Sequence, residues 1–257
     1  MSAIHYRVVH VLRQVARLIR FYCYPIPYLA RNYLRSIGAS LQCTFVGDPI
    51  CLDLGAGTAP YKKTIINAFG IRHYIAVDIA PSDTTSVVAD ASKLPFNDQA
   101  VSLVVSMDVL QHIPDPLAVL NEIYRVLLPG GLLIISFPFL YGECDAADYR
   151  RWSIAGMEND LAQRGFEVLN IKRRGGLFFS AASGLHLAAQ LVIPGGRKSW
   201  RSSVTPSTVV RSAIVVVLTI PTTLVAWLAL LVDFVVKPKS LLGYYMGALM
   251  VCRRPPL

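Results

Sequence analysis

Short apolar segments alternate with helical patterns through the middle of the chain. Five continuous apolar runs have the character of strands buried on both faces: Ile50–Leu54, Tyr74–Val77, Ser86–Ala89, Leu103–Ser106 and Leu132–Phe137. Between them lie helical patterns such as Pro116–Leu127, which Pro129-Gly130-Gly131 is expected to end. Two further strands are predicted at Phe166–Arg173 and Tyr244–Cys252. This rhythm predicts an α/β fold with a doubly wound, mostly parallel sheet of seven strands.

The first residues of the chain predict a basic amphipathic helix over Ile4–Tyr22. Its apolar side chains fall on one helical stripe, and its arginines fall on the opposite face. Those arginines interrupt every apolar stretch that a secretory signal would need, whereas a mitochondrial transit peptide stays open as a minor alternative. Pro25 and Pro27 are expected to end this helix.

An uncharged segment long enough to cross a bilayer runs from Ser212 to Val232. Pro221 interrupts it and permits a bent or re-entrant element. A single crossing is excluded if the two last predicted strands share one sheet, because both then lie on the same side of the membrane. A two-span hairpin with Leu177–Ile193 would translocate basic residues against the positive-inside tendency. The pattern therefore favours a monotopic hairpin, with burial against protein as the alternative.

Charge is distributed unevenly along the 257 residues, whose net charge is +9. Residues 1–47 hold six arginines and no acid, residues 48–167 have a net charge of −7, and residues 168–257 have a net charge of +10. Basic arms indicate an anionic partner surface. Because aliphatic runs accompany the basic residues and the mean hydropathy is +0.47, we expect the cytoplasmic side of a membrane and no nucleic acid.

Composition also suggests where the segments divide. We expect a basic N-terminal segment at 1–47, a core at 48–175, an apolar insertion at 176–240, and the last strand with the tail at 241–257. The five cysteines form no C-x-x-C pair, which predicts a reducing compartment, no disulfide framework and no metal site. The oligomeric state stays open.

A candidate ligand site follows the first predicted strand, at Asp53-Leu54-Gly55-Ala56-Gly57. Glycines at a strand-to-helix turn let a ligand approach the backbone. Asp78 ends the second strand twenty-one residues after Gly57, where a carboxylate can accept bonds from both ribose hydroxyls. Asp90 follows the third strand and can face an adenine amino group, or instead cap the next turn. Three carboxylates would repel a pyrophosphate, so the ligand is expected to be cationic and to lack phosphate, as S-adenosylmethionine is.

Several motifs in order resemble the class I S-adenosylmethionine-dependent methyltransferase family, type 11 branch. They are Asp53–Tyr61, Tyr74–Asp78, Ala89–Ala91, Lys93–Phe96, Leu110–Pro116 and Glu122–Gly131. The resemblance implies a Rossmann-like fold and S-adenosyl-L-methionine as the cofactor. It further implies which residues bind each part of the cofactor. The methionine part lies against Asp53, Gly55, Ala56 and Gly57, the ribose and adenine against Asp78, Ile79, Asp90 and Ala91, and the sulfonium against Ser106 and Met107.

Catalytic residues are less evident in the sequence. The family usually has Asp in place of Ser102 and Glu in place of Gln111. Methyl transfer from a sulfonium needs alignment first, and needs a general base only if the acceptor is a hydroxyl. His112 and Glu143 are the candidate bases, and a purely structural role for His112 stays equally open.

The function expected from the sequence is membrane-associated methylation of a lipid-linked or glycan-type acceptor. The segment Tyr141–Ser153 resembles a stretch found in methyltransferases of bacterial cell-surface glycan gene sets, although its usual histidine is missing. Two alternatives remain: methylation of a quinone-type or other small molecule, and a catalytically silent cofactor-fold scaffold at the membrane, motivated by Ser102 and Gln111.

Overall fold

The computed structural model describes residues 25–41, 45, 47–143, 147–191, 221–235 and 244–256. The predicted helix Ile4–Tyr22 lies outside these residues. The chain forms two compact units. We call one the sheet unit (residues 30–139, 146–174 and 247–257) and the other the helical unit (residues 1–29, 140–145 and 175–246).

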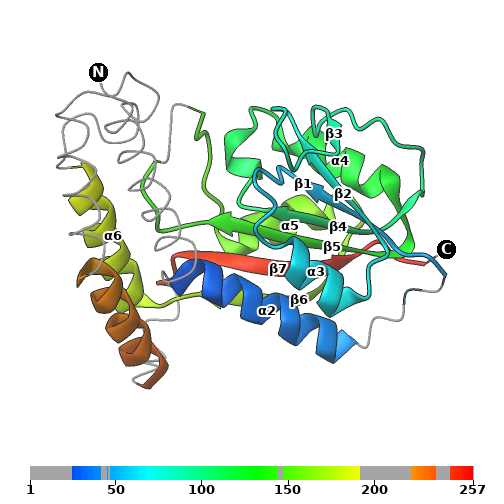
Figure 1. Cartoon of the computed structure of the whole chain (residues 1–257). Coiled ribbons are helices and arrows are strands. Elements are labelled where there is room, and N and C mark those ends of the chain that lie inside the picture. Colours follow the sequence, from blue (N-terminus) through cyan, green and yellow to red (C-terminus); the bar gives the residue numbers. More distant parts are fainter. Residues whose placement is uncertain are drawn as a thin grey trace. The chain divides into compact units, whose positions relative to one another are not determined.

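A seven-stranded mixed sheet forms the centre of the sheet unit, with the strand order β3-β2-β1-β4-β5-β7-β6 (Figure 1). The strands are β1 (Ile50–Leu54), β2 (His73–Asp78), β3 (Val87–Val88), β4 (Val101–Met107), β5 (Leu127–Pro138), β6 (Glu167–Arg174) and β7 (Gly247–Arg253). Neighbours from β3 to β5 pair in parallel, and β7 runs antiparallel to both β5 and β6. The doubly wound, mostly parallel, seven-stranded prediction is confirmed.

Helices cover both faces of this sheet. Figure 1 shows α2 (Pro25–Leu41) and α3 (Lys62–Phe69) in front of it, with α4 (Pro116–Val126) and α5 (Ile154–Ala162) behind. On the α2 and α3 side, Leu34 and Ile65 pack against Cys51, Leu103 and other strand side chains in one buried core. Because β4 and the second half of β5 are buried on both faces, their sequences are continuously apolar rather than alternating.

Pro25 and Pro27 lie in the first turn of α2, where a missing N–H leaves no hydrogen bond unmade. The end of the predicted helix Ile4–Tyr22, which these prolines were expected to mark, lies outside the described residues. One local prediction was wrong. The segment Pro129-Gly130-Gly131 was expected to end the α4 helix, but α4 ends at Val126 and Leu127 already begins β5. The Pro-Gly-Gly segment instead lies where the register between β4 and β5 shifts.

In the helical unit, α6 (Leu177–Leu191) and the helix of residues 221–235 are described. Phe179, Ala182, Ala226 and Met246 form a small buried core between segments of this unit. Asp233 accepts hydrogen bonds from the backbone N–H groups at the start of α6, at 2.8–3.1 Å. The second half of the apolar segment is therefore helical, and its first half lies outside the described residues. Within the described ranges, none of the helices has the length and apolar character that crossing a membrane requires.

Candidate functional site

The predicted cofactor residues collect at the carboxyl edge of β1, β2 and β4. Because β1 lies between the other two strands, the loops that follow all three begin side by side. The turn after β1 is fixed to β2, since the backbone N–H groups of Gly55 and Ala56 both donate to the carbonyl of Val77, at 2.8 and 3.2 Å. Such an edge is where open parallel sheets bind their ligands.

Gly55 and Gly57 are needed for different reasons. Both have positive φ angles, of 65° and 54°. A Cβ on Gly55 would come within 2.5 Å of the Val109 side chain, so packing excludes any larger residue there. A Cβ on Gly57 would meet nothing within 4 Å, so that glycine leaves an open backbone surface that a ligand can approach.

Asp78 is directed at this turn. Its Oδ2 accepts from the Gly57 backbone N–H at 2.9 Å, and its Oδ1 accepts from the backbone N–H of Ala80 at 3.0 Å. These bonds hold the carboxylate beside Gly57, as the ribose role requires. The next side chain, Ile79, is 74% exposed, which gives an apolar surface suited to an aromatic base.

Asp53 is buried, with 3% of its surface exposed. It accepts a short hydrogen bond from the Tyr74 hydroxyl. Burial raises the pKa of Asp53 to about 6, the Tyr74 hydrogen bond opposes that rise, and the nearby charge of Asp78 adds to it. A carboxylate destabilised in this way gains most from a cationic neighbour.

Asp90 and Ala91 lie in a turn after β3. Asp90 Oδ1 accepts from both the backbone N–H and the hydroxyl of Ser92, at 2.8 Å each, and these bonds lower the pKa of Asp90. The turn-capping alternative is therefore observed. An exposed carboxylate has a second oxygen, Oδ2, so a bond to an adenine amino group stays a compatible prediction.

The residues after β4 are placed less simply. Ser106 is fully buried, and its hydroxyl has no hydrogen-bond partner among the described residues. Met107 is partly buried against the core on the α2 and α3 side. Direct contact of either side chain with the sulfonium stays a prediction.

An ion pair that the sequence did not reveal lies beside this edge. Arg174, at the end of β6 and 6% exposed, donates two hydrogen bonds to Asp108, at 2.6 and 2.7 Å. Asp108 has a positive φ of 56° directly after β4. Gln111 donates to the Asp108 carbonyl at 2.7 Å, so the family departure at Gln111 has a structural role in the loop. Sixty-six residues separate the paired charges, which is why local pattern could not identify the pair.

Neither candidate base is established by the geometry. The His112 Nδ1 lies 2.8 Å from the carbonyl oxygen of Ala147, in keeping with the structural alternative. Glu143 is exposed and belongs to the helical unit. Among the described residues, no group of three or more His, Cys, Asp or Glu side chains is arranged to hold a metal ion.

The residues at the edge fit S-adenosylmethionine. The open surface at Gly57 accommodates a ligand against the backbone, Asp78 provides oxygens for a ribose, and Asp53 provides negative charge for a cation. A dinucleotide pyrophosphate would instead meet these carboxylates without a compensating cation from the turn.

Comparison with known proteins identifies similar methyltransferases. A family model described as a methyltransferase domain matches residues 52–135. An uncharacterized methyltransferase of Mycobacterium leprae (strain Br4923) is 28% identical over 243 residues, covering 79% of this chain and 87% of that protein. One from Mycolicibacterium paratuberculosis is 30% identical over 190 residues, covering 64% and 72%. The fold resembles that of a proposed sarcosine dimethylglycine methyltransferase from Galdieria sulphuraria, with a TM-score of 0.56 at 18% identity, covering 89% and 86%.

Proposed function

We propose, from the premise that this chain belongs to the class I S-adenosylmethionine-dependent methyltransferase family, that it methylates an acceptor presented at a membrane surface. The acceptor is of the lipid-linked or glycan type. One observation carries this proposal, namely the exposed apolar face of the helix at residues 221–235.

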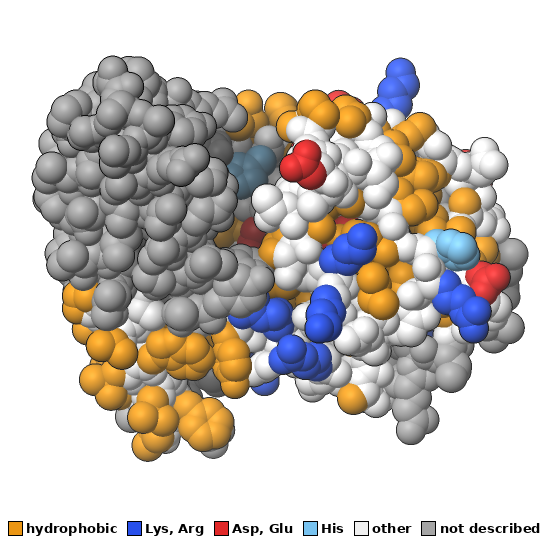
Figure 2. All heavy atoms as spheres, viewed as in Figure 1, with side chains coloured by type: hydrophobic (Ala, Val, Ile, Leu, Met, Phe, Trp, Pro, Cys, Tyr) orange, Lys and Arg blue, Asp and Glu red, His pale blue; other side chains and the backbone are white. Residues whose placement is uncertain are grey.

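That face is continuous along the helix. Leu224, Leu228, Leu231 and Val235 follow one another at intervals of four, three and four residues, which places them on one side of an α-helix. Their exposed fractions range from 57% to 71%. Figure 2 shows the corresponding gathering of hydrophobic side chains. Soluble monomers rarely expose contiguous apolar patches of this kind unless the patch binds a partner or a membrane.

Positive charge supports a lipid partner over a protein partner. Lys237 and Lys239 follow this helix directly in the sequence. In the sheet unit, Figure 2 shows lysine and arginine side chains gathered over α2 and α3. Each basic residue near an anionic bilayer contributes about 1 kcal/mol of attraction. Apolar anchors together with basic flanks are typical of interfacial segments.

The residues of the sheet unit supply alignment. When bound, S-adenosylmethionine provides an electrophilic methyl group on its sulfonium. Asp78 and Asp90 are expected to fix the adenosine, and Asp53 to stabilise the positive charge near the reacting centre. If the acceptor is a hydroxyl, His112 is the stronger candidate base. The Ala147 carbonyl only accepts, so the contact at Nδ1 is a hydrogen bond donated by the ring, which holds the imidazole in a fixed orientation.

Vesicle flotation tests the membrane part of the proposal. The variant Leu224→Ser, Leu228→Ser, Leu231→Ser removes three side chains that are more than half exposed. At about 1 kcal/mol for each partly buried leucine, its partition onto vesicles containing anionic lipid is expected to fall about a hundredfold. The matched control Val88→Ser, Leu128→Ser removes exposed apolar surface from the sheet unit and is expected to float like the wild type. Unchanged flotation of the triple variant contradicts the proposal.

Mass spectrometry of lipid and glycan extracts tests the acceptor. Cells with the active protein are expected to contain a membrane-extracted species heavier by one methylene than in cells that carry the Asp78→Ala variant. A methylated product found only in the aqueous small-molecule fraction would favour the alternative, a small-molecule methyltransferase. The family membership supports an enzyme over the silent scaffold.

A further inference from the structure

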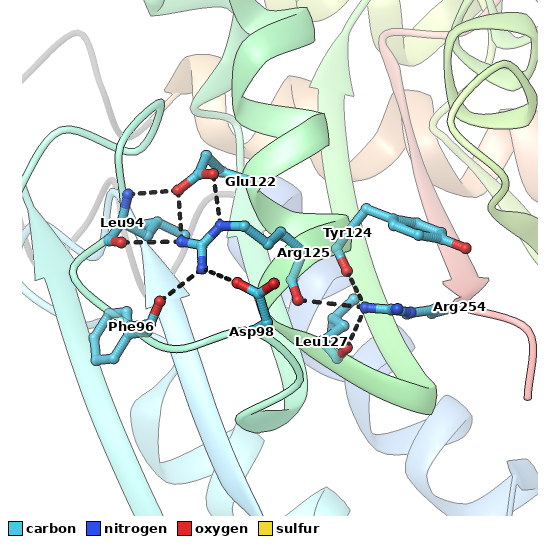
Figure 3. A network of polar contacts seen from close by, with 8 residues as sticks. All are labelled: Leu94, Phe96, Asp98, Glu122, Tyr124, Arg125, Leu127 and Arg254. Carbon is cyan, nitrogen blue, oxygen red and sulfur yellow. Dashed lines mark hydrogen bonds and ion pairs between the residues drawn. The ribbon is translucent and has the colours of Figure 1, made fainter. Parts of the chain in front are cut away.

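Two side chains of α4 hold the loop that carries Asp90. Glu122 accepts from the Leu94 backbone N–H at 2.8 Å, and Arg125 donates to the carbonyls of Leu94 and Phe96 at 3.1 and 2.8 Å. The two side chains are also paired with each other by two hydrogen bonds of 2.8 Å. Figure 3 shows the Arg125 guanidinium between the loop and the helix, with Asp98 as a further partner.

These bonds replace the ones that a strand would make. Residues 89–100 contain no strand, so their backbone groups need other partners. The Leu94 side chain is buried, and both of its backbone polar groups bond to the α4 pair. The conformation of this loop is therefore set by α4 rather than by the sheet.

Asp90 is held from both sides. On one side, the Ala89 backbone N–H donates to the Asp78 carbonyl at 3.0 Å. On the other side, the Lys93 backbone N–H closes a turn on the Asp90 carbonyl at 2.9 Å, and Leu94 follows directly. Only three residues separate Asp90 from the residue that the α4 pair binds. Because this connection is short and hydrogen-bonded, a displacement of Leu94 also displaces Asp90.

We infer that Glu122 and Arg125 are positioning residues for the cofactor, which set the place of the adenine-binding carboxylate through the loop of residues 90–98. The inference rests on the adenine role of Asp90, and it is independent of the acceptor and of membrane binding. Its chemical logic is preorganisation: a ligand binds more weakly when its binding group must first be ordered. Both side chains are charged and only partly exposed, and the Glu122–Arg125 bonds lower the pKa of Glu122, so the pair stays ionised near neutral pH.

Arg254, in the tail after β7, offers a control because it binds the same helix. It donates to the backbone carbonyls of Tyr124, Arg125 and Leu127 at 2.7, 3.3 and 2.9 Å, and its guanidinium lies 4.6 Å from the centre of the Tyr124 ring. These contacts stabilise the carboxyl end of α4 (Figure 3) but do not reach the loop of residues 90–98. A loss of general stability can therefore be separated from a loss of positioning.

The test is calorimetry with S-adenosylhomocysteine, the demethylated product, together with thermal unfolding of the full chain. Arg125→Met and Glu122→Gln are expected to raise Kd about tenfold. The Kd of Arg125→Lys is expected to lie between theirs and that of the wild type. Arg254→Met is expected to lower Tm while Kd stays within twofold. If Arg125→Met lowers Tm but leaves Kd unchanged, the pair is only structural and the inference is overturned.

A double-mutant cycle tests the route of the effect. If Arg125 acts through Asp90, then Arg125→Met weakens Kd little further in an Asp90→Ala background. If the fold-changes in Kd of the two single variants multiply in the double variant, the inference is overturned. An Asp90→Ala variant that binds like the wild type would overturn it as well. None of these variants alters the face of the helix at 221–235, so failure here is distinguishable from failure of vesicle flotation.

Discussion

Replacing Asp53 with asparagine is expected to stabilise the protein at neutral pH. The carboxyl is 3% exposed, and burial raises its pKa from an ordinary value near 4 to about 6. The folded protein therefore binds this proton more tightly than the unfolded chain does. The contribution of Asp53 to stability is greatest below pH 4 and is lost as the pH rises through about 6.

The size of this effect follows from the pKa. One pKa unit corresponds to about 1.4 kcal/mol, so ionising Asp53 in the folded state costs up to about 3 kcal/mol. Asparagine is uncharged and its side-chain oxygen can still accept from the Tyr74 hydroxyl, so Asp53→Asn removes this cost and keeps the bond.

Urea unfolding at pH 4.5 and at pH 7.5 measures this difference. The variant is expected to gain roughly 2 kcal/mol relative to the wild type between these pH values, because the remainder of the cost is already present at pH 4.5. Asp83→Asn, at an exposed carboxyl, is the control and should show no such gain. If the difference between Asp53→Asn and the wild type were the same at both pH values, the reasoning about Asp53 would be refuted.

Four further substitutions probe the site and its supports. Asp108→Asn is expected to lower the free energy of unfolding by about 3 kcal/mol, because it leaves the buried Arg174 charge without its carboxylate. Arg174→Met is expected to cost less, since the Asp108 side chain that it leaves behind is one-third exposed. Chemical denaturation compares the two variants. Gly55→Ala, by collision with Val109, should lower Tm by several degrees in a thermal melt. Asp115→Ala removes the cap of α4 and should cost about 1 kcal/mol in urea unfolding.

Pattern alone predicted the central strands because they are buried on both faces. Runs such as Leu103–Ser106 are almost entirely apolar, and most predicted strands lie within one or two residues of the observed ones. The predicted start of β5 was five residues late, and that of β7 was three residues early. The glycine turn and Asp78 were predictable for a related reason, since positive φ and a strand-end carboxylate are local requirements. The helix α2 was missed because proline both ends and begins helices, and sequence does not show which.

Long-range pairings were beyond prediction from the sequence. Nothing near Asp108 indicates Arg174, and the two meet only because β6 ends at the same edge as β4. The pKa of Asp53 depends on burial beneath Tyr74 and on the proximity of Asp78, which are products of the packing of β1 against β2. Such contacts are set by tertiary structure, so the sequence predicts the residues of the site better than their electrostatics.

Isothermal titration of S-adenosylmethionine into the wild type and Asp78→Ala tests the central claim most directly. The wild type is expected to bind at a single site, and the variant to bind at least tenfold more weakly, because the ribose loses hydrogen bonds to a charged acceptor worth about 1.5 kcal/mol or more. Asp83→Ala, which removes a nearby exposed carboxylate, should bind like the wild type. Absence of binding by the wild type, or equal binding by Asp78→Ala, would contradict the placement of the cofactor at this turn.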